Sequence, residues 1–144
     1  MTVRFRNVEV MGDDLEAWPY EAIVTLIERG TIGDWARLGR AIGDSPWGSV
    51  ARQVEEFLAY SQEPAVAALF LRRVAHAREE QARAERDEVA ARVRGFVDRS
   101  GLSRTEFSEA AGTSRTRLST YCSGKVAPSA GLLVRMERIS ARGH

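Results

Sequence analysis

The segment from Pro64 to Arg99 constrains the fold of this chain most strongly, because after its first residue it holds no proline and one glycine, Gly95. Apolar residues recur at helical spacing near both ends: Val66, Leu69, Phe70 and Val74 at the start, and Val89, Val93, Phe96 and Val97 at the end. Residues 76–88 between them are almost wholly Ala, Arg, Glu and Gln, all strong helix formers. We therefore predict one helix of about 50 Å, whose central segment is exposed to solvent and links two ends that pack into cores.

Three shorter helices are predicted before this segment. The first begins at Pro19 and ends at Gly30, the second runs from a Thr31–Asp34 cap to Gly43, and the third opens at Ser45-Pro46. Their expected buried stripes are Ile23, Leu26 and Ile27; Trp35, Leu38 and Ile42; and Val50, Val54, Phe57 and Leu58. We interpret the tryptophans, Trp18, Trp35 and Trp47, as core or hinge anchors and not as ligand-stacking groups.

The N-terminal residues carry a weaker signal. Val3, Phe5, Val8 and Val10 alternate with polar residues, which predicts a short strand or an ordered arm. Residues 11–16 are acidic, contain a glycine and are expected to form a loop. The role of residues 1–18 is left open.

The C-terminal third predicts two short helices joined by a glycine turn and followed by a last helix. Ser103 and Glu106 form a capping box for the first helix, whose inward side is expected to carry Phe107, Ala110 and Ala111. Gly112 makes the turn, and Ser114 caps a helix running to about Cys122. After a loop through Pro128, Ser129 caps a helix that buries Leu132, Leu133, Met136 and Ile139. This order is the helix-turn-helix plan.

The residues of this third also resemble a known family. The matching positions are Gly101 to Phe107, Ala111 to Ser114, Leu118-Ser119, Tyr121, Ser123-Gly124-Lys125 and Pro128-Ser129. They resemble the Cro/Xre-type, lambda-repressor-like helix-turn-helix DNA-binding domain, and the resemblance covers about residues 88–141. The chain departs from the family's pattern at Arg104, where Gln is frequent, at Ser108, where Ala is favoured, and at Cys122, where an acid is favoured. These departures leave the expected DNA binding intact, but because of them the family's pattern does not define which DNA sequence this chain recognises.

The geometry of the helix after Ser114 predicts which residues face DNA. At about 100° per residue, Arg115, Thr116, Ser119 and Thr120 fall on one face, opposite Leu118 and Tyr121. We expect these four to contact bases, with Arg115 donating two bonds to a guanine. The resemblance implies that Arg104 and Lys125 contact phosphates. Ser114 and Ser123 at the helix ends are further predicted phosphate contacts. Arg117 points toward the flank of the helix and is predicted to contact a phosphate, with a neighbouring helix as the alternative.

The charge distribution agrees with a nucleic-acid partner at one end of the chain. Residues 1–87 hold 11 Arg/Lys and 15 Asp/Glu, whereas residues 88–144 hold 10 Arg/Lys and 5 Asp/Glu. The balance is therefore −4 in the first part and +5 in the second, although patchiness of a solvated surface would look the same.

Enzyme and metal chemistry are not predicted. The only histidines, His76 and His144, form no metal-ligand pattern with Cys122, and the acidic run Asp13, Asp14 and Glu16 is expected to be solvated. We expect no cofactor. The single cysteine and the absence of an apolar run of about 18 residues predict a cytoplasmic protein without a membrane segment.

Together these observations predict an all-α fold in three parts: an N-terminal helical domain (1–75) for dimerisation or partner binding, a helical linker (76–87) and a helix-turn-helix domain (88–144). The first functional hypothesis is a transcriptional regulator that binds a palindromic operator in double-stranded DNA as a homodimer. The second is an antitoxin, whose N-terminal domain binds a toxin while its C-terminal domain regulates the shared operon. The alanines in the central segment of the long helix are an alternative dimer contact. A coiled coil is disfavoured, because the segment lacks sustained apolar heptads. A third interpretation is a helix-turn-helix kept only as a scaffold.

Overall fold

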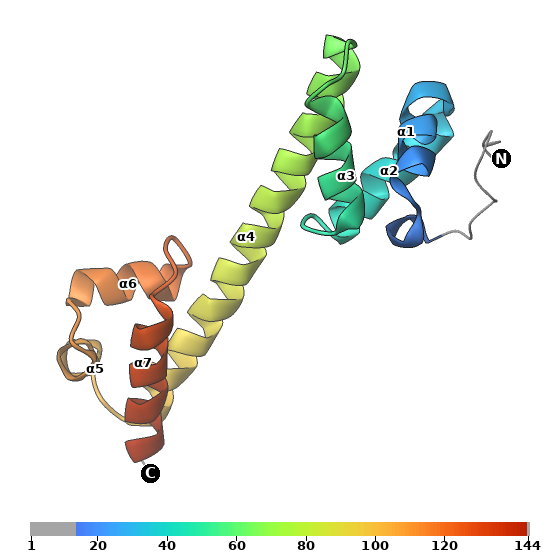
Figure 1. Ribbon diagram of the computed structural model, residues 1–144. Coiled ribbons are helices and arrows are strands. Elements are labelled where there is room, and N and C mark those ends of the chain that lie inside the picture. The colour runs from blue at the N-terminus through green and yellow to red at the C-terminus, as the bar shows by residue number, and fades with distance from the viewer. Residues whose placement is uncertain (1–13, 144) are drawn as a thin grey trace. The chain divides into compact units, whose positions relative to one another are not determined.

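The computed structural model describes residues 14–143, which are all-helical and contain no strand (Figure 1). The elements are η1 (Leu15–Ala17), α1 (Tyr20–Arg29), α2 (Ile32–Asp44), α3 (Ser49–Leu58), α4 (Pro64–Ser100), α5 (Arg104–Ala111), α6 (Arg115–Ser123) and α7 (Ala130–Arg142). The all-α prediction is thus confirmed. The strand or arm predicted for residues 1–10 lies outside the described residues, as do Asp13 and His144.

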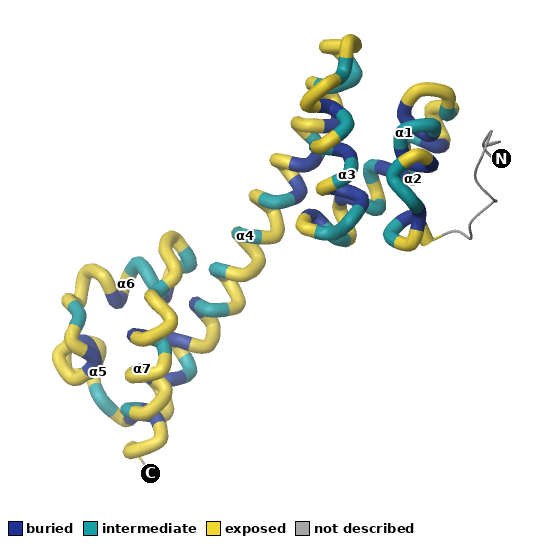
Figure 2. Tube along the Cα trace, in the orientation of Figure 1, coloured by how far each residue is buried: buried dark blue, intermediate teal, exposed yellow. Residues whose placement is uncertain are grey.

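The chain divides into two compact units, Met1–Gln81 and Ala82–His144, here called the N-terminal and C-terminal units. Helix α4 contributes its first half to one unit and its second half to the other. As predicted, it is one uninterrupted helix, and Gly95 does not break it. Residues 79–88 are exposed except for Ala82 and Arg86, which are half-buried, and Figure 2 shows this mostly exposed stretch.

The core of the N-terminal unit is built from one apolar stripe on each of its helices. Among its members are Ile23 and Leu26 of α1, Leu38 and Ile42 of α2, Val50 and Val54 of α3, and Phe70, Val74 and Ala77 of α4. Most of the predicted stripe residues are buried there, whereas Trp35, Phe57 and Val66 are half-buried and Leu69 is 54% exposed. The packed part of α4 therefore extends beyond His76 to Ala77.

One of the three tryptophans does not anchor the core. Trp18 is buried and Trp35 packs against the core, but Trp47 is 63% exposed, so of the two predicted roles, core or hinge anchor, Trp47 does not have the first. The reason is that Trp47 lies in the turn between α2 and α3, where the guanidinium carbon of Arg78 sits 4.0 Å from its ring centroid. Arg78 also donates to the Pro46 carbonyl (2.9 Å) and pairs with Glu55, so it fastens α4 to this turn.

Helix α3 begins at Ser49 and not at the predicted Ser45-Pro46. Ser45 instead ends α2, because its backbone N–H donates to the Ala41 carbonyl. The N-cap residue of α3, Gly48, has no side chain, and Glu16 takes over the capping from a distance in sequence. The Glu16 carboxylate accepts from the backbone N–H of Ser49 (2.9 Å) and from the Ser49 hydroxyl (2.7 Å). The acidic segment is thus not simply solvated, since Glu16 is half-buried and Asp14 caps η1.

The C-terminal unit packs α5, α6 and α7 against the second half of α4. Its buried residues come from all four helices: Val93, Phe96 and Val97; Phe107 and Ala111; Leu118 and Cys122; Leu132 and Met136. Ala110 is exposed, which corrects the prediction that it faces inward. On α5 the buried face is formed by Phe107, Ser108 and Ala111, and a rotation of about 100° per residue turns Ala110 away from it. No helix in the described part of the chain is long and apolar enough to cross a membrane.

Candidate nucleic-acid interface

The turn between α5 and α6 is fixed by local hydrogen bonds. The predicted capping box is present at the start of α5: Ser103 Oγ accepts from the Glu106 N–H (3.2 Å), and the Glu106 carboxylate accepts from the Ser103 N–H (3.2 Å). Hydrogen bonding of its carboxylate to the Ser103 side chain, and to a smaller extent to the Ser103 backbone N–H, holds the pKa of the Glu106 carboxyl below its usual range. The helix ends at Gly112, which adopts φ 78°, a left-handed conformation that favours glycine. The Ser114 hydroxyl then starts α6 by accepting from the Arg117 N–H (3.1 Å).

Helix α6 has one buried side and one exposed side. Leu118 and Cys122, one turn apart, are buried, and Tyr121 is half-buried against the same core. Arg115, Thr116, Arg117 and Ser119 are exposed. The predicted division of this helix into a core face and a polar face therefore holds for these residues.

The C-terminal end of α6 is held by α4. Arg94 on α4 donates through Nη1 to the carbonyl oxygen of Cys122 at 2.5 Å. A cation at this end offsets the partial negative charge of the helix terminus. Gly124, at φ 80°, turns the chain out of α6, and a Cβ atom there would lie 2.7 Å from Asp87 Oδ1. Sequence reasoning did not identify Arg94, since no local pattern links residues 28 positions apart.

Arg115 is placed by a residue that the sequence did not single out. Its Nη1 donates to Thr105 Oγ1 on α5 at 3.3 Å, so its guanidinium reaches back across the turn. Both side chains are exposed, which leaves the other guanidinium N–H groups open to solvent. The signal in the sequence that could have found this contact is the predicted glycine turn, because it places α5 and α6 against each other.

The hydroxyl groups predicted to contact DNA differ in whether they already take part in hydrogen bonds within α6. Thr120 is half-buried and its hydroxyl donates to the Arg117 carbonyl (2.6 Å); Ser123 donates likewise to the Thr120 carbonyl (3.0 Å). Their hydroxyl protons are engaged within α6, which leaves the Thr120 methyl and the oxygen lone pairs for other contacts. Thr116 and Ser119 make no side-chain hydrogen bond to another described residue.

The predicted flanking cations occupy exposed positions at the ends of the motif. Arg104 is the first residue of α5, and Lys125 follows Gly124 just beyond α6. In Figure 1, α5 is seen nearly end-on while α6 lies across the view, so the two helix axes are far from parallel. Ser103 and Ser114 cap the two helices, whose N-termini can accept an anion.

A short helix joined by a glycine turn to a second helix, whose outer side carries cations and hydroxyls, defines the helix-turn-helix class of DNA-binding folds. A family model described as a helix-turn-helix domain matches residues 69–141, just over half of the chain. The chain therefore belongs to this helix-turn-helix domain family, which is Cro/Xre-like. The comparisons with curated proteins and with solved structures gave no match.

Membership of this family indicates a DNA-binding regulatory protein. Domains of this family are typically not enzymatic. No group of three or more His, Cys, Asp or Glu side chains within residues 14–143 is placed to hold a metal ion. Cys122 is buried and free.

Proposed function

We propose that this protein is a sequence-specific transcriptional regulator that inserts α6 into the major groove of DNA. One observation carries the proposal: α6 is anchored by Leu118 and Cys122, while Arg115, Thr116 and Ser119 remain exposed. A helix fixed to its core on one side and polar on the other can enter the groove without unfolding its domain.

The contacts divide into two kinds. Arg115 donates to guanine O6 and N7, and Thr116, Ser119 and Thr120 contact neighbouring bases, with Thr120 offering its methyl group to a thymine. The phosphates are contacted by residues at the helix ends and the loop: Arg104, Ser114, Arg117, Ser123 and Lys125. The exposed positions of all these residues except half-buried Thr120 support this division.

We further propose that the protein binds a palindromic operator as a homodimer and acts in the cytoplasm, at the nucleoid. One domain of this size makes few base contacts, and a second copy on a half-site about 34 Å away supplies the rest. The dimer contact is expected in residues 1–75, in α4 or beside α7.

The antitoxin function is the second candidate, and exposed apolar side chains of the N-terminal unit favour it. Ile32 is 86% exposed, Tyr60 83% and Leu69 54%, so these apolar side chains are accessible to a protein partner. In this case the N-terminal unit binds a toxin, and the helix-turn-helix regulates the shared operon. A small toxic protein encoded by the adjacent gene would favour this candidate over a stand-alone regulator.

The experiment that tests the main proposal is fluorescence anisotropy with labelled DNA from the protein's own upstream region, measured over a salt series. We expect binding that weakens steeply with salt, because Arg and Lys release counterions from phosphates. Arg115→Ala is compared with Arg72→Ala, which removes the same charge from an exposed position in the N-terminal unit. Weak, salt-insensitive binding that both variants leave unchanged would identify the helix-turn-helix as a scaffold.

A further inference from the structure

A cavity of about 590 Å³ opens in the N-terminal unit, between α1, α2, α3 and the start of α4. Its apolar lining comes from four helices: Ile27, Trp35, Phe57 and Val66. The volume lies within the range of about 300–1,000 Å³ that is usual for small-molecule sites. The function proposed above makes no use of this cavity.

The indole of Trp35 is fixed before any ligand arrives. Its Nε1–H is shared between the carbonyl oxygens of Leu26 (3.2 Å) and Ile27 (3.1 Å). The ring also meets Phe70 edge to face, with 5.6 Å between centroids. Because the N–H is engaged, Trp35 offers a ligand its aromatic surface and no hydrogen-bond donor.

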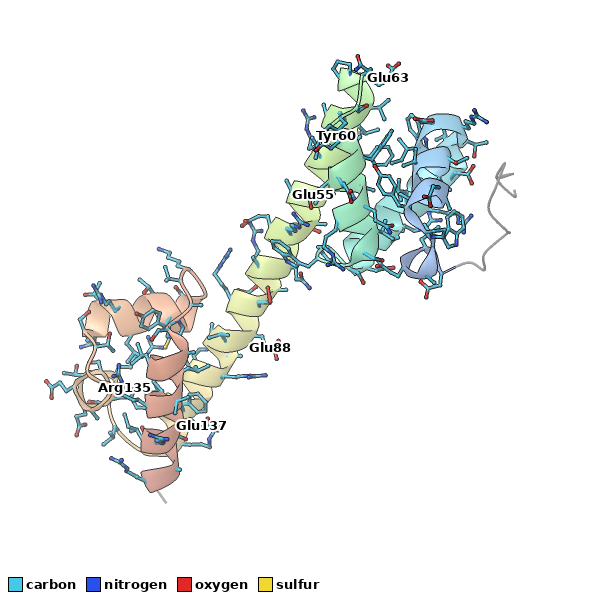
Figure 3. All side chains as sticks on the ribbon, in the orientation of Figure 1. Glu55, Tyr60, Glu63, Glu88, Arg135 and Glu137 are labelled. Atoms are coloured by element: carbon cyan, nitrogen blue, oxygen red, sulfur yellow. The ribbon has the colours of Figure 1, made fainter. Side chains whose placement is uncertain are left out.

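The rim of the cavity is acidic. Glu28 on α1 and Glu63 directly before α4 both line it and are exposed, and no Arg, Lys or His is among its described lining residues. Glu63 stands at the N-terminus of α4, where the helix dipole attracts a negative charge. Tyr60, which is 83% exposed, completes the rim, and Figure 3 shows Tyr60 and Glu63 at the connection between α3 and α4.

Further negative charge gathers next to this rim. The pKa of the Tyr20 hydroxyl is raised by burial and, to a smaller extent, by the carboxylates of Glu56 and Glu21 and by Tyr60. Tyr20 therefore lies within electrostatic range of Tyr60 and of two carboxylates, which add to the negative charge of Glu28 and Glu63 on this side of the unit. An anionic ligand would be repelled here, whereas a cation would be attracted.

We propose that this cavity binds a small organic cation with an apolar body, such as an aromatic or alkyl ammonium compound. The apolar body lies against Ile27, Phe57 and Val66. The ammonium group lies beside the aromatic rings of Trp35 and Tyr60, whose faces attract cations, and is neutralised by Glu28 and Glu63. As a ligand site this cavity is independent of the DNA binding proposed above.

The test is isothermal titration calorimetry of the full chain, without DNA, using benzyltrimethylammonium as the probe. Benzoate and benzyl alcohol serve as the anionic and neutral aromatic controls. We expect saturable binding of the cation, at least tenfold weaker binding of benzyl alcohol and no binding of benzoate. The double variant Glu28→Gln/Glu63→Gln should bind the cation about fivefold to tenfold more weakly, since each exposed carboxylate contributes modestly.

Two further variants make the result specific. Tyr60→Ala should weaken cation binding about threefold to tenfold while Tyr60→Phe keeps it, because the ring and not the hydroxyl attracts the cation. Glu85→Gln/Glu109→Gln removes the same charge from exposed positions in the C-terminal unit and should leave binding unchanged. A Kd of roughly 1 mM is about the weakest affinity worth calling a site. If benzyltrimethylammonium does not bind at about ten times that concentration, the proposal is overturned. Equal affinity for benzyl alcohol, or no effect of the Glu28/Glu63 substitutions, would overturn it as well.

Discussion

Arg94 and Cys122 are joined by a hydrogen bond of 2.5 Å from the guanidinium to the backbone carbonyl, and this bond ties the long helix α4 to the C-terminal end of α6. The contact is made to a main-chain atom, so it does not depend on the side chain at position 122. It holds the proposed recognition helix at one end, while Leu118 anchors its middle in the core. The position of α6 therefore depends on α4 as well as on its partner helix α5.

The first prediction concerns this bond. Arg94→Met removes the donor and the cation at the end of α6, and we expect the free energy of unfolding to fall by about 1–2 kcal/mol. Arg94→Lys keeps the charge and should lose less. Urea unfolding followed by far-UV circular dichroism measures both variants. An unchanged midpoint for Arg94→Met would show that the bond contributes nothing to the stability of α6.

The second prediction concerns glycine conformation. Gly112 has φ 78°, so Gly112→Ala places a Cβ atom in a left-handed residue and should destabilise the fold by about 1–2 kcal/mol. Gly131 lies in α7 with open space around its Cα and no positive φ, so Gly131→Ala should stabilise the fold by about 0.5 kcal/mol. Opposite shifts of the urea midpoint are expected, and shifts of the same sign would contradict the turn geometry.

The third prediction is a pH dependence from the capping box. The pKa of Glu106 is lowered by its bonds to Ser103, so the unfolded chain takes up this proton at a higher pH than the folded chain does. The contribution of Glu106 to stability is therefore complete above the unfolded pKa of about 4.3 and is lost as the pH falls through the lower folded value.

Unfolding midpoints measured from pH 6 down to pH 2.5 test this dependence. Wild type should be more stable than Glu106→Gln at pH 6, and the difference should shrink at the acid end. Glu109→Gln, an exposed acid on the same helix that takes no part in the cap, serves as the control. A difference that grows as the pH falls would be incompatible with the cap.

The fourth prediction concerns the N-terminal unit. Glu16→Ala removes the carboxylate that caps α3 and should cost about 1–2 kcal/mol. Glu16→Gln keeps one acceptor oxygen and should fall between this variant and wild type. All three tryptophans lie in residues 1–81, so tryptophan fluorescence follows the unfolding of this unit. No change on substitution to Ala would mean that Gly48 and water cap α3 without help.

The features that could be predicted from the sequence are those governed by neighbouring residues. The long helix followed from its uninterrupted helix formers, and both capping boxes, at Thr31–Asp34 and Ser103–Glu106, are confirmed because they join residues three apart. The division of α6 into a buried and an exposed side followed from helical periodicity alone. The base and phosphate contacts assigned to this helix stay predictions.

The features that escaped prediction depend on contacts between distant residues. The start of α3 was misplaced because the cap is supplied by Glu16, 33 positions before Ser49. Trp47 was assigned on residue type as a core or hinge anchor, and the turn that holds it leaves it at the surface under Arg78 instead of in the core. Ala110 was assigned inward because alanine is apolar, whereas the buried face of α5 includes the polar Ser108, whose hydroxyl donates to the Thr105 carbonyl.

The most direct test of the central claim compares Arg115→Ala with Lys125→Ala on upstream DNA and on a scrambled fragment of the same length. If α6 reads bases, Arg115→Ala lowers the preference for the upstream DNA by about 1–3 kcal/mol. Lys125→Ala should instead weaken binding to both fragments equally and reduce the salt slope by about one. A preference that survives Arg115→Ala unchanged would contradict the account, because another part of the chain would then select the sequence.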